Sequence, residues 1–293
     1  MEAAILSRKL KTRVSSLKRN YEQALHQFRE EQLPLWNYRF SQSSATWRKL
    51  KNRYAGQRCF IIGNGPSLKS QDLTLLKDEI TFVTNWFVLH EDYEKINPTY
   101  HCICAHEVFG GWRKDIQFDP KLYQLLKEKT RQTTKVFPFF FESGIKAQEL
   151  FTDDEVAYLL YGPKVQEIHQ VGHMNLDIAS QRMYMGHTVI SIFCLPIAHY
   201  LGFKEIYLLG CDCDYGVQQP SDQRGYFYES AQHSTKAPDF EWLKRSWAAD
   251  GPMIQAYAVA RHEFEKSGRV IYNATAGGRL EVFPRVNFED LFK

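Results

Sequence analysis

The chain has 293 residues, 44% of them hydrophobic, and a formal net charge of +3 at pH 7. This length and composition are enough for one large globular domain with an extensive core, and no low-complexity tract interrupts the sequence. No apolar run approaches the roughly 20 residues needed to cross a bilayer, and the start MEAAILSRKLK is too charged for a signal peptide, so we place the protein in the cytoplasm.

The charge is concentrated at the N-terminal end. Residues 1–58 hold 13 of the 37 Lys/Arg and 4 of the 34 Asp/Glu, a net charge of +9, which leaves 24 against 30, or −6, for the remainder. Apolar residues at steps of three and four, from Leu10 to Phe28, form one stripe on a basic helix expected over 3–31. This helix could lie on an anionic membrane surface through residues 1–30, pair with a partner helix, or pack on its own domain. No basic–aromatic repeat accompanies the charge, so we expect no nucleic-acid partner.

Pro34 is expected to end this helix, before a polar connector over 41–47 and a short basic helix near 46–54. Downstream, stretches rich in β-branched and aromatic residues alternate with helical patterns. This alternation predicts an α/β fold with a doubly wound, mostly parallel sheet of the Rossmann type. The expected strands are 59–62, 80–85, 100–105, 135–141, 205–210 and 269–274, and the expected helices are about 70–78, 119–131, 188–202 and 252–267.

We therefore divide the chain into an N-terminal helical extension, 1–56, and a nucleotide-binding catalytic domain, 57–293. The stretch 143–186 shows no clear pattern. Residues 214–247 are rich in Tyr, Gln, Ser, Asp and Gly without periodicity, which is typical of a lid loop over an active site.

The first expected strand runs into the turn GNGPS at 63–67. A strand that ends in a glycine turn brings backbone amides up to a phosphate in many α/β proteins. We expect Gly63 and Gly65 to adopt positive φ and leave their amide hydrogens unshielded, and Ser67 to cap the next helix. Leu68 occupies the position where a Walker A loop or a dinucleotide fingerprint needs a glycine or small residue, which disfavours a P-loop NTPase and a standard Rossmann dehydrogenase. An ordinary strand-to-helix turn is the alternative.

Polar residues follow the other expected strands as well, at the edge of the sheet where ligands of open α/β proteins bind. Asp212 and Asp214 leave the sheet together; one could bind ribose hydroxyls, or the pair could hold Mg²⁺ or Mn²⁺ against a diphosphate. Asp214 could instead cap a turn. Asn85 follows the second strand, and His106 follows the third, where it could shuttle a proton or be an ordinary hydrogen-bonded histidine.

The six cysteines lie within or beside strand-like stretches, and none forms a C-x-x-C pair. Because zinc and disulfide frameworks usually need such spacings, we expect reduced, buried thiols. The six are Cys59, Cys102, Cys104, Cys194, Cys211 and Cys213.

Together these segments resemble the bacterial family-42 sialyltransferases and a related α/β family that includes the central domain of flagellin-glycosylating motility accessory factors. The similarity lies in IIGNGPSLK at 61–69, in Asn85 and in LGFKEIYLLGCDCDY at 201–215, and it covers roughly residues 57–110 and 186–293. It implies a Rossmann-type nucleotide-binding domain and a CMP-activated nine-carbon acid sugar as donor. The residues it assigns to the donor are Gly63, Asn64, Gly65, Pro66, Ser67, Asn85, His106, Thr188, Ser191, Asp212 and Asp214.

Two departures from the sialyltransferase pattern concern catalysis. Ala248 stands where those enzymes carry a general-base histidine, and Asp214 stands where they carry a tyrosine that helps the phosphate to depart. We therefore expect the base to be His233 in the lid loop, with Asp250 as the substitute. Asp250 could equally cap the 252–267 helix. The archaeal hydroxymethylpterin diphosphokinases are a second similar family, with a glycine turn and an acidic, metal-using site.

The expected function is that of a glycosyltransferase that uses a nucleotide-activated sugar to build or decorate a surface glycan or glycoprotein. It requires no further cofactor, its acceptor is a glycan or a protein, and residues 1–30 would make it peripheral on the inner face of the cell membrane, where it could form homo-oligomers. The alternatives are a Mg²⁺-dependent diphosphokinase acting on a pterin-like alcohol and a non-catalytic nucleotide-binding module.

Overall fold

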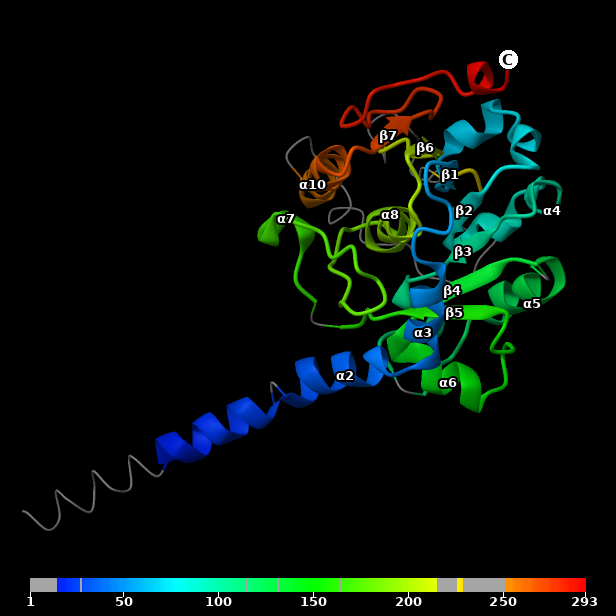
Figure 1. Ribbon diagram of the computed structural model, residues 1–293. Coiled ribbons are helices and arrows are strands. Elements are labelled where there is room, and N and C mark those ends of the chain that lie inside the picture. The colour runs from blue at the N-terminus through cyan, green and yellow to red at the C-terminus, as the bar shows by residue number, and fades with distance from the viewer. Residues whose placement is uncertain are drawn as a thin grey trace, which may run out of the picture.

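The protein is an α/β structure built on one parallel sheet (Figure 1). The computed structural model describes residues 15–26, 28–113, 115–130, 132–163, 165–214, 226–228 and 251–293. In this part of the chain seven strands, all parallel, form a single sheet in the order β5-β4-β3-β2-β1-β6-β7. The strands are β1 (Arg58–Ile62), β2 (Thr81–Thr84), β3 (Tyr100–Cys102), β4 (Thr134–Pro138), β5 (Val156–Leu159), β6 (Glu205–Leu209) and β7 (Val270–Asn273). The predicted doubly wound α/β fold is confirmed.

The strands are apolar on both faces because helices cover both faces of the sheet. Along β1, Cys59 and Ile61 pack into one hydrophobic layer, whereas Phe60 and Ile62 pack into the opposite one. Figure 1 shows α8 and α10 on one side of the sheet and α4 and α5 on the other. The helices are α3 (Gln42–Leu50), α7 (Ile168–Val171), α8 (Leu195–Leu201) and α10 (Pro252–Lys266) on the first side, and α4 (Tyr93–Ile96), α5 (Pro120–Lys129) and α6 (Glu142–Ala147) on the second.

Most expected elements are present, with differences that have local causes. The helix expected over 70–78 is replaced by two short 3-10 turns, Pro66–Ser70 and Leu73–Leu76. The second turn starts afresh because the Asp72 carboxylate accepts a hydrogen bond from Thr74 N (3.1 Å) and caps it. Strand β5 lies in the stretch that the sequence pattern left unassigned, and the 188–202 helix begins as a π-turn, Ile190–Cys194, before α8.

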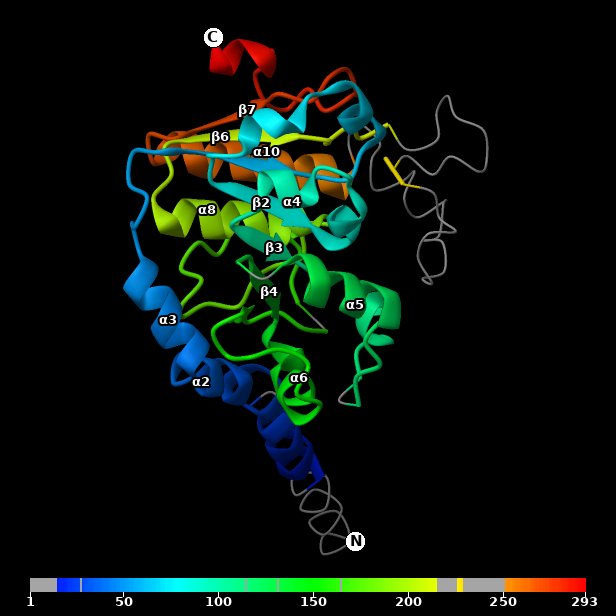
Figure 2. The same ribbon diagram turned by 90° about the vertical axis from the view of Figure 1, so that its right-hand side faces the viewer.

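The N-terminal region is helical over 15–26 and continues through a π-turn, Phe28–Gln32, into α2 (Leu33–Arg39). Pro34 does not end the helical region; it lies in the first turn of α2, directly after the π-turn, where its fixed φ suits a helix. Figures 1 and 2 show this region leading away from the α/β body. Its exposed large apolar side chains are Leu17, Tyr21, Phe28, Leu33, Trp36 and Phe40.

The expected connector over 41–47 is part of α3, and it packs on the α/β body. Ser41 caps this helix by accepting a hydrogen bond from Ser44 N (3.2 Å). Tyr38 and Trp47 are fully buried. Trp47 Nε1 donates a hydrogen bond to Tyr158 O (2.9 Å), and the Tyr38 hydroxyl donates to Ile178 O (2.6 Å) and lies 3.1 Å from Tyr158 O. The second half of the predicted extension is therefore fixed to the sheet at β5. None of the described helices combines the length and the apolar character needed to cross a membrane.

Candidate functional site

The strand order reverses between β1 and β6, which are neighbours in the sheet but are far apart along the chain. Ligands of open α/β sheets bind at the carboxyl ends of the strands at such a switch point. The segment after β1 is the glycine turn, 63–67, and the segment after β6 contains Asp212 and Asp214. The fold thus brings together the two segments that carry most of the predicted donor-binding residues.

The glycine turn is hydrogen-bonded to the end of β6. Gly63 N donates to Leu209 O (2.8 Å), and Gly65 N donates to Gly210 O (2.9 Å). Gly65 has φ −68°, and Gly63 is not among the residues with positive φ. The expectation of positive φ and unshielded amides at these two glycines is therefore wrong.

The two glycines are needed for close approach instead. A Cβ on Gly63 would lie 2.5 Å from Gly210 O, and a Cβ on Gly65 would overlap the carboxylate of Asp212, with Cγ at 2.6 Å. No side chain larger than hydrogen fits at either position without a shift of the β6 segment or of Asp212.

Asp212 makes the central contact of the site. Its side chain is buried, with the residue 9% exposed; Oδ1 accepts from Ser67 N (3.1 Å), and Oδ2 accepts from the Ser67 hydroxyl (2.7 Å). Burial raises the pKa of the Asp212 carboxyl, and the two hydrogen bonds from Ser67 partly offset that rise. Both donors of Ser67 are thus directed to a carboxylate, so an incoming anion would have to replace Asp212 at this turn.

Two buried amide oxygens lie on the β2 side of the turn. Asn64 Nδ2 donates to Thr84 O (3.0 Å) and Oγ1 (3.1 Å), while Asn64 Oδ1 is buried without a hydrogen-bond partner among the described residues. Asn85 Oδ1 is also buried without a hydrogen-bond partner among the described residues, and the Asn85 backbone has φ +44°. Because buried acceptors are nearly always paired, these two oxygens are candidates to receive hydroxyl or amino groups of a ligand.

The buried side chain of His101 is hydrogen-bonded to the backbone of Asn85. His101 Nε2 donates to Asn85 O (2.6 Å), and its Nδ1 lies 3.1 Å from the Tyr93 hydroxyl, which donates to it. Burial lowers the pKa of His101 to about 4, so the ring is neutral at physiological pH. The left-handed conformation of Asn85 is therefore fixed by a hydrogen bond from the core.

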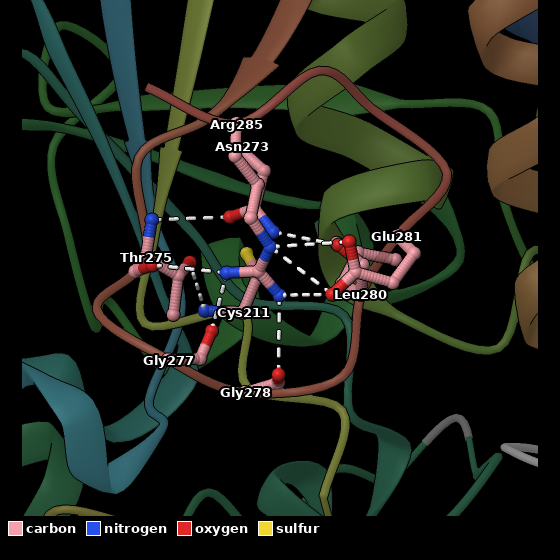
Figure 3. Close-up of polar contacts among 8 residues, drawn as sticks. All are labelled: Cys211, Asn273, Thr275, Gly277, Gly278, Leu280, Glu281 and Arg285. Carbon is pink, nitrogen blue, oxygen red and sulfur yellow. Dashed lines mark hydrogen bonds and ion pairs between the residues drawn. The ribbon is translucent and has the colours of Figure 1, made fainter. Parts of the chain in front are cut away.

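The loop after β7, residues 274–285, closes the other side of the site, and we refer to it as the β7 loop. Figure 3 shows Arg285 at its centre, where the guanidinium donates to Gly277 O (2.5 Å) and Gly278 O (3.1 Å) and forms an ion pair with Glu281 (2.6 Å). Asn273 Nδ2 donates to Leu280 O (2.7 Å) across the same loop. One side chain therefore holds most of the loop in place.

The β7 loop contacts Asp212 directly. A Cβ on Gly278 would lie 2.7 Å from Asp212 O, and Arg279 N donates to that oxygen (2.6 Å). The Arg279 guanidinium is largely exposed and lies 4.0 Å from the Asp214 carboxylate. Arg279 was not predicted as a site residue, because only the fold brings this arginine beside the two carboxylates.

The remaining predicted donor residues lie further along the same edge. The His106 ring stacks on Trp112, with ring centroids 5.3 Å apart, and is partly exposed. Thr188 Oγ1 lies 3.1 Å from the Tyr257 hydroxyl. Ser191 is fully buried and its hydroxyl donates to Gly186 O (2.7 Å), so this side chain holds the backbone at Gly186 in place and is not exposed to a ligand.

The two predicted catalytic residues, His233 and Asp250, lie outside the described residues, as does most of the expected lid loop. Residues 226–228 of that loop are described. Phe227 N donates to Asn64 O (2.9 Å), and its ring contacts His90, with centroids 5.0 Å apart. This part of the expected lid thus lies against the glycine turn.

All six cysteines are free and buried, as predicted. Burial raises the pKa of the thiols of Cys59, Cys104, Cys194, Cys211 and Cys213. The magnesium or manganese site predicted at Asp212 and Asp214 stays a prediction; within the described residues these two carboxylates belong to no cluster of three metal-binding side chains.

No family model matches this sequence, and no curated protein matches it. Among solved structures, the chain is similar to the sialyltransferase CstII from Campylobacter jejuni, solved in complex with a substrate analogue, cytidine-5'-monophosphate. The two are 17% identical, the alignment covers 79% of this chain and 85% of that one, and the TM-score is 0.46. A likeness at this level is no argument for a shared activity.

Proposed function

We propose that the protein is a glycosyltransferase whose donor, a nucleotide-activated sugar, binds where the chain leaves β2, β1 and β6. The observation that carries the proposal is the set of acceptors at this switch point. Asn64 and Asn85 each present a buried side-chain oxygen without a hydrogen-bond partner in the described structure, and the buried Asp212 carboxylate lies against the same turn. Such a set suits the hydroxyl and amino groups of a nucleoside.

The ribose diol would bind Asp212. Two vicinal hydroxyls can donate to the two carboxylate oxygens and replace Ser67 there, which would release the Ser67 N–H and O–H for the phosphate. Arg279 would lie near the leaving phosphate and offset its charge. A CMP-linked nine-carbon acid sugar is the first donor to test, because the sequence resembles the family-42 sialyltransferases.

The reaction would be a displacement at the anomeric carbon. The acceptor oxygen forms a bond to that carbon, the bond from the carbon to the phosphate oxygen breaks, and the nucleotide leaves with the electron pair. A base takes the proton of the acceptor hydroxyl. We assign the role of this base to His233, with Asp250 as the substitute. The product of the reaction would be a surface glycan or a glycoprotein.

One observation favours a second function. Asp214 Oδ1 is buried and has no hydrogen-bond partner among the described residues, although Arg279 lies 4.0 Å away. With Asp212 it could hold Mg²⁺ against a diphosphate, as a diphosphokinase acting on a pterin-like alcohol would require.

Isothermal titration of the full chain with CMP, UDP, GDP and ATP, each with and without Mg²⁺, separates these functions. CMP binding that is indifferent to Mg²⁺ supports the sialyltransferase-like function, and Mg²⁺-dependent ATP binding supports the diphosphokinase. Absence of binding by all four favours a non-catalytic scaffolding module that binds no nucleotide. Asp212→Asn should weaken the bound nucleotide by roughly 1.5–3 kcal/mol, or about 10- to 150-fold, whereas the exposed control Asp78→Asn should not change its affinity.

We also propose that residues 1–30 place the enzyme on the inner, anionic face of the cell membrane. In the described part of this segment Leu17 and Tyr21 are 62% and 68% exposed, and basic side chains such as Lys18 and Arg19 lie beside them. Deletion of residues 1–30 should move the protein from membrane to soluble fractions and leave nucleotide affinity unchanged. Unchanged fractionation, or a change from dimer to monomer instead, would point to a partner helix.

A further inference from the structure

A second polar cluster shares no residue with the glycine turn and lies partly in the stretch without a sequence prediction. Glu167 Oε2 is 3.1 Å from His169 Nδ1 and 3.1 Å from His187 Nε2. The three atoms all lie within 4.8 Å of one another, and in the described part of the chain this is the one such cluster of three metal-binding side chains.

Backbone contacts hold the two segments of this cluster together. Glu167 forms a parallel bridge with Met185, in which Ile168 N donates to Met185 O (2.9 Å) and Met185 N donates to Gln166 O (2.8 Å). His187 follows two residues later and adopts φ +64°, a conformation that costs a non-glycine residue free energy. The fold thus keeps an unfavourable backbone conformation at the residue that turns its ring toward Glu167.

The position of His187 is fixed from the other side as well. Gly186 approaches Ser191 so closely that a Cβ would overlap the Ser191 hydroxyl. That hydroxyl donates to Gly186 O (2.7 Å), and Thr188 accepts a hydrogen bond from Ser191 N (3.0 Å). The cluster is therefore pre-organised by groups that take no part in it.

Two of the three separations between ligand atoms match those between the ligands of one metal ion, and the third, between the two imidazole nitrogens, lies within 4.8 Å. Two ligand atoms each about 2.1 Å from Zn²⁺ are about 3.4 Å apart at a tetrahedral angle and about 3.0 Å apart at a right angle. The two Glu167–histidine separations, both 3.1 Å, lie between these values, and the contact with His187 Nε2 is also a hydrogen bond in this structure. The contact of His169 Nδ1 with Glu167 is not a hydrogen bond, and this buried nitrogen has no hydrogen-bond partner in the described structure.

We propose that Glu167, His169 and His187 bind one divalent transition-metal ion of the zinc class. Two imidazoles and one carboxylate are a donor set that Zn²⁺ accepts while it keeps a coordination position open. The Glu167 side chain is 33% exposed, so solvent can reach that position. The site shares no residue with the donor site and does not depend on the proposed glycosyltransferase function.

The site lies at the same edge of the sheet as the glycine turn. The segment after His187 runs through the π-turn Ile190–Cys194 and α8 into β6. Because a crossover helix runs antiparallel to the strands that it connects, its start lies at their carboxyl ends.

The test uses the full chain after chelator treatment and removal of the chelator. Titration with Zn²⁺ should show one ion per chain, and Co²⁺ should give the visible absorption bands of a nitrogen- and oxygen-coordinated ion. Glu167→Gln and His169→Asn should each lower Zn²⁺ affinity at least about 10- to 100-fold, the loss caused even by removing an outer-shell partner. His187→Asn should do the same, and asparagine tolerates the left-handed backbone at this position.

The matched control is His173→Asn, an exposed histidine of the same segment whose Nδ1 lies 3.1 Å from Val171 O. The His173→Asn variant should bind Zn²⁺ with the same affinity as the unchanged chain. The proposal is overturned if no ion binds at one per chain, if affinity survives in all three site variants, or if Co²⁺ shows thiolate charge-transfer bands that indicate the cysteines. Thermal unfolding of each metal-free variant verifies that it is folded, and the three variants test the cluster independently.

Discussion

Gly65→Ala is the sharpest test of how the glycine turn is built. Gly65 has φ −68°, which alanine adopts readily, so the backbone conformation would favour the substitution by about 0.4–1 kcal/mol. The added methyl group, however, would lie 2.6 Å from Asp212 Cγ and 2.7 Å from Gly210 O. The side chain of Asp212 must therefore turn away from the site.

The cost of that movement follows from the hydrogen bonds that are lost. Asp212 would release Ser67 N and the Ser67 hydroxyl, now at 3.1 and 2.7 Å, and each hydrogen bond to a buried charged group contributes about 1.5–3 kcal/mol. After the gain in backbone entropy is subtracted, Gly65→Ala should reduce the free energy of unfolding by roughly 2–5 kcal/mol.

The assay is guanidinium unfolding followed by circular dichroism in a double-mutant cycle. In an Asp212→Ala background the two hydrogen bonds are already absent, so Gly65→Ala should cost at least about 1.5 kcal/mol less there than in the unchanged chain. The control is Gly162→Ala, where a Cβ would meet Phe140 at an ordinary 3.6 Å and stability should change by less than about 1 kcal/mol. A loss at Gly65 below about 0.5 kcal/mol, or an equal loss in both backgrounds, would refute the reasoning.

Two further predictions concern the groups that support the site. Because burial lowers the pKa of His101 to about 4, against about 6.5 when unfolded, the unfolded chain takes up this proton first as pH falls, and this group should lower the free energy of unfolding by roughly 2 kcal/mol between pH 7 and 5. Burial lowers the pKa of His199 to about 4 as well, so His101→Gln should remove about half of the loss that the two histidines cause together. Arg285→Ala should release the β7 loop, reduce the free energy of unfolding by about 1–3 kcal/mol and speed trypsin cleavage after Arg279. Arg285→Lys should restore little of this stability, because an ammonium group cannot donate to Gly277, Gly278 and Glu281 together.

Each of these has a clear opposing result. An acid-induced loss of stability that is the same in the His101→Gln chain would assign it to other groups. Trypsin cleavage after Arg279 at an unchanged rate in Arg285→Ala would show that the β7 loop is held by its other contacts, such as the hydrogen bond from Asn273 to Leu280 O.

The fold could be predicted because its signals are local. Each expected strand from 59–62 to 269–274 is a short apolar run bounded by polar or turn residues, and the helical patterns between them require parallel crossovers. Strand β5 escaped prediction because VAYLLY at 156–161 is an apolar run that periodicity cannot distinguish from a buried helix, and it lies in a stretch without a regular pattern. The connector at 41–47 is helical because Ser41 caps the helix, Ser44 donates a hydrogen bond to Ala179 O and Trp47 donates one to Tyr158 O in β5; the last two are tertiary contacts.

The edge of the sheet could also be predicted, since residues after parallel strands share one side, but the pairing of side chains across that edge could not. The sequence does not show that Ser67 donates to Asp212, or that Gly65 is small because of a neighbour and not because of its φ angle. The cluster of Glu167, His169 and His187 depends on an isolated bridge between segments, for which E-x-H at 167–169 is the only local sign.

The Ser67–Asp212 contact has a consequence for selectivity. Under the proposed function, the Asp212 carboxylate occupies the place of the donor phosphate at Ser67, so inorganic phosphate alone would be repelled by this carboxylate and could not displace it. A free nucleoside could draw it aside but would leave the serine donors unused. Only a molecule that carries both a sugar diol and a phosphate can replace the hydrogen bonds of Asp212 and those of Ser67 together. The unliganded protein should therefore bind neither free phosphate nor a free nucleoside tightly.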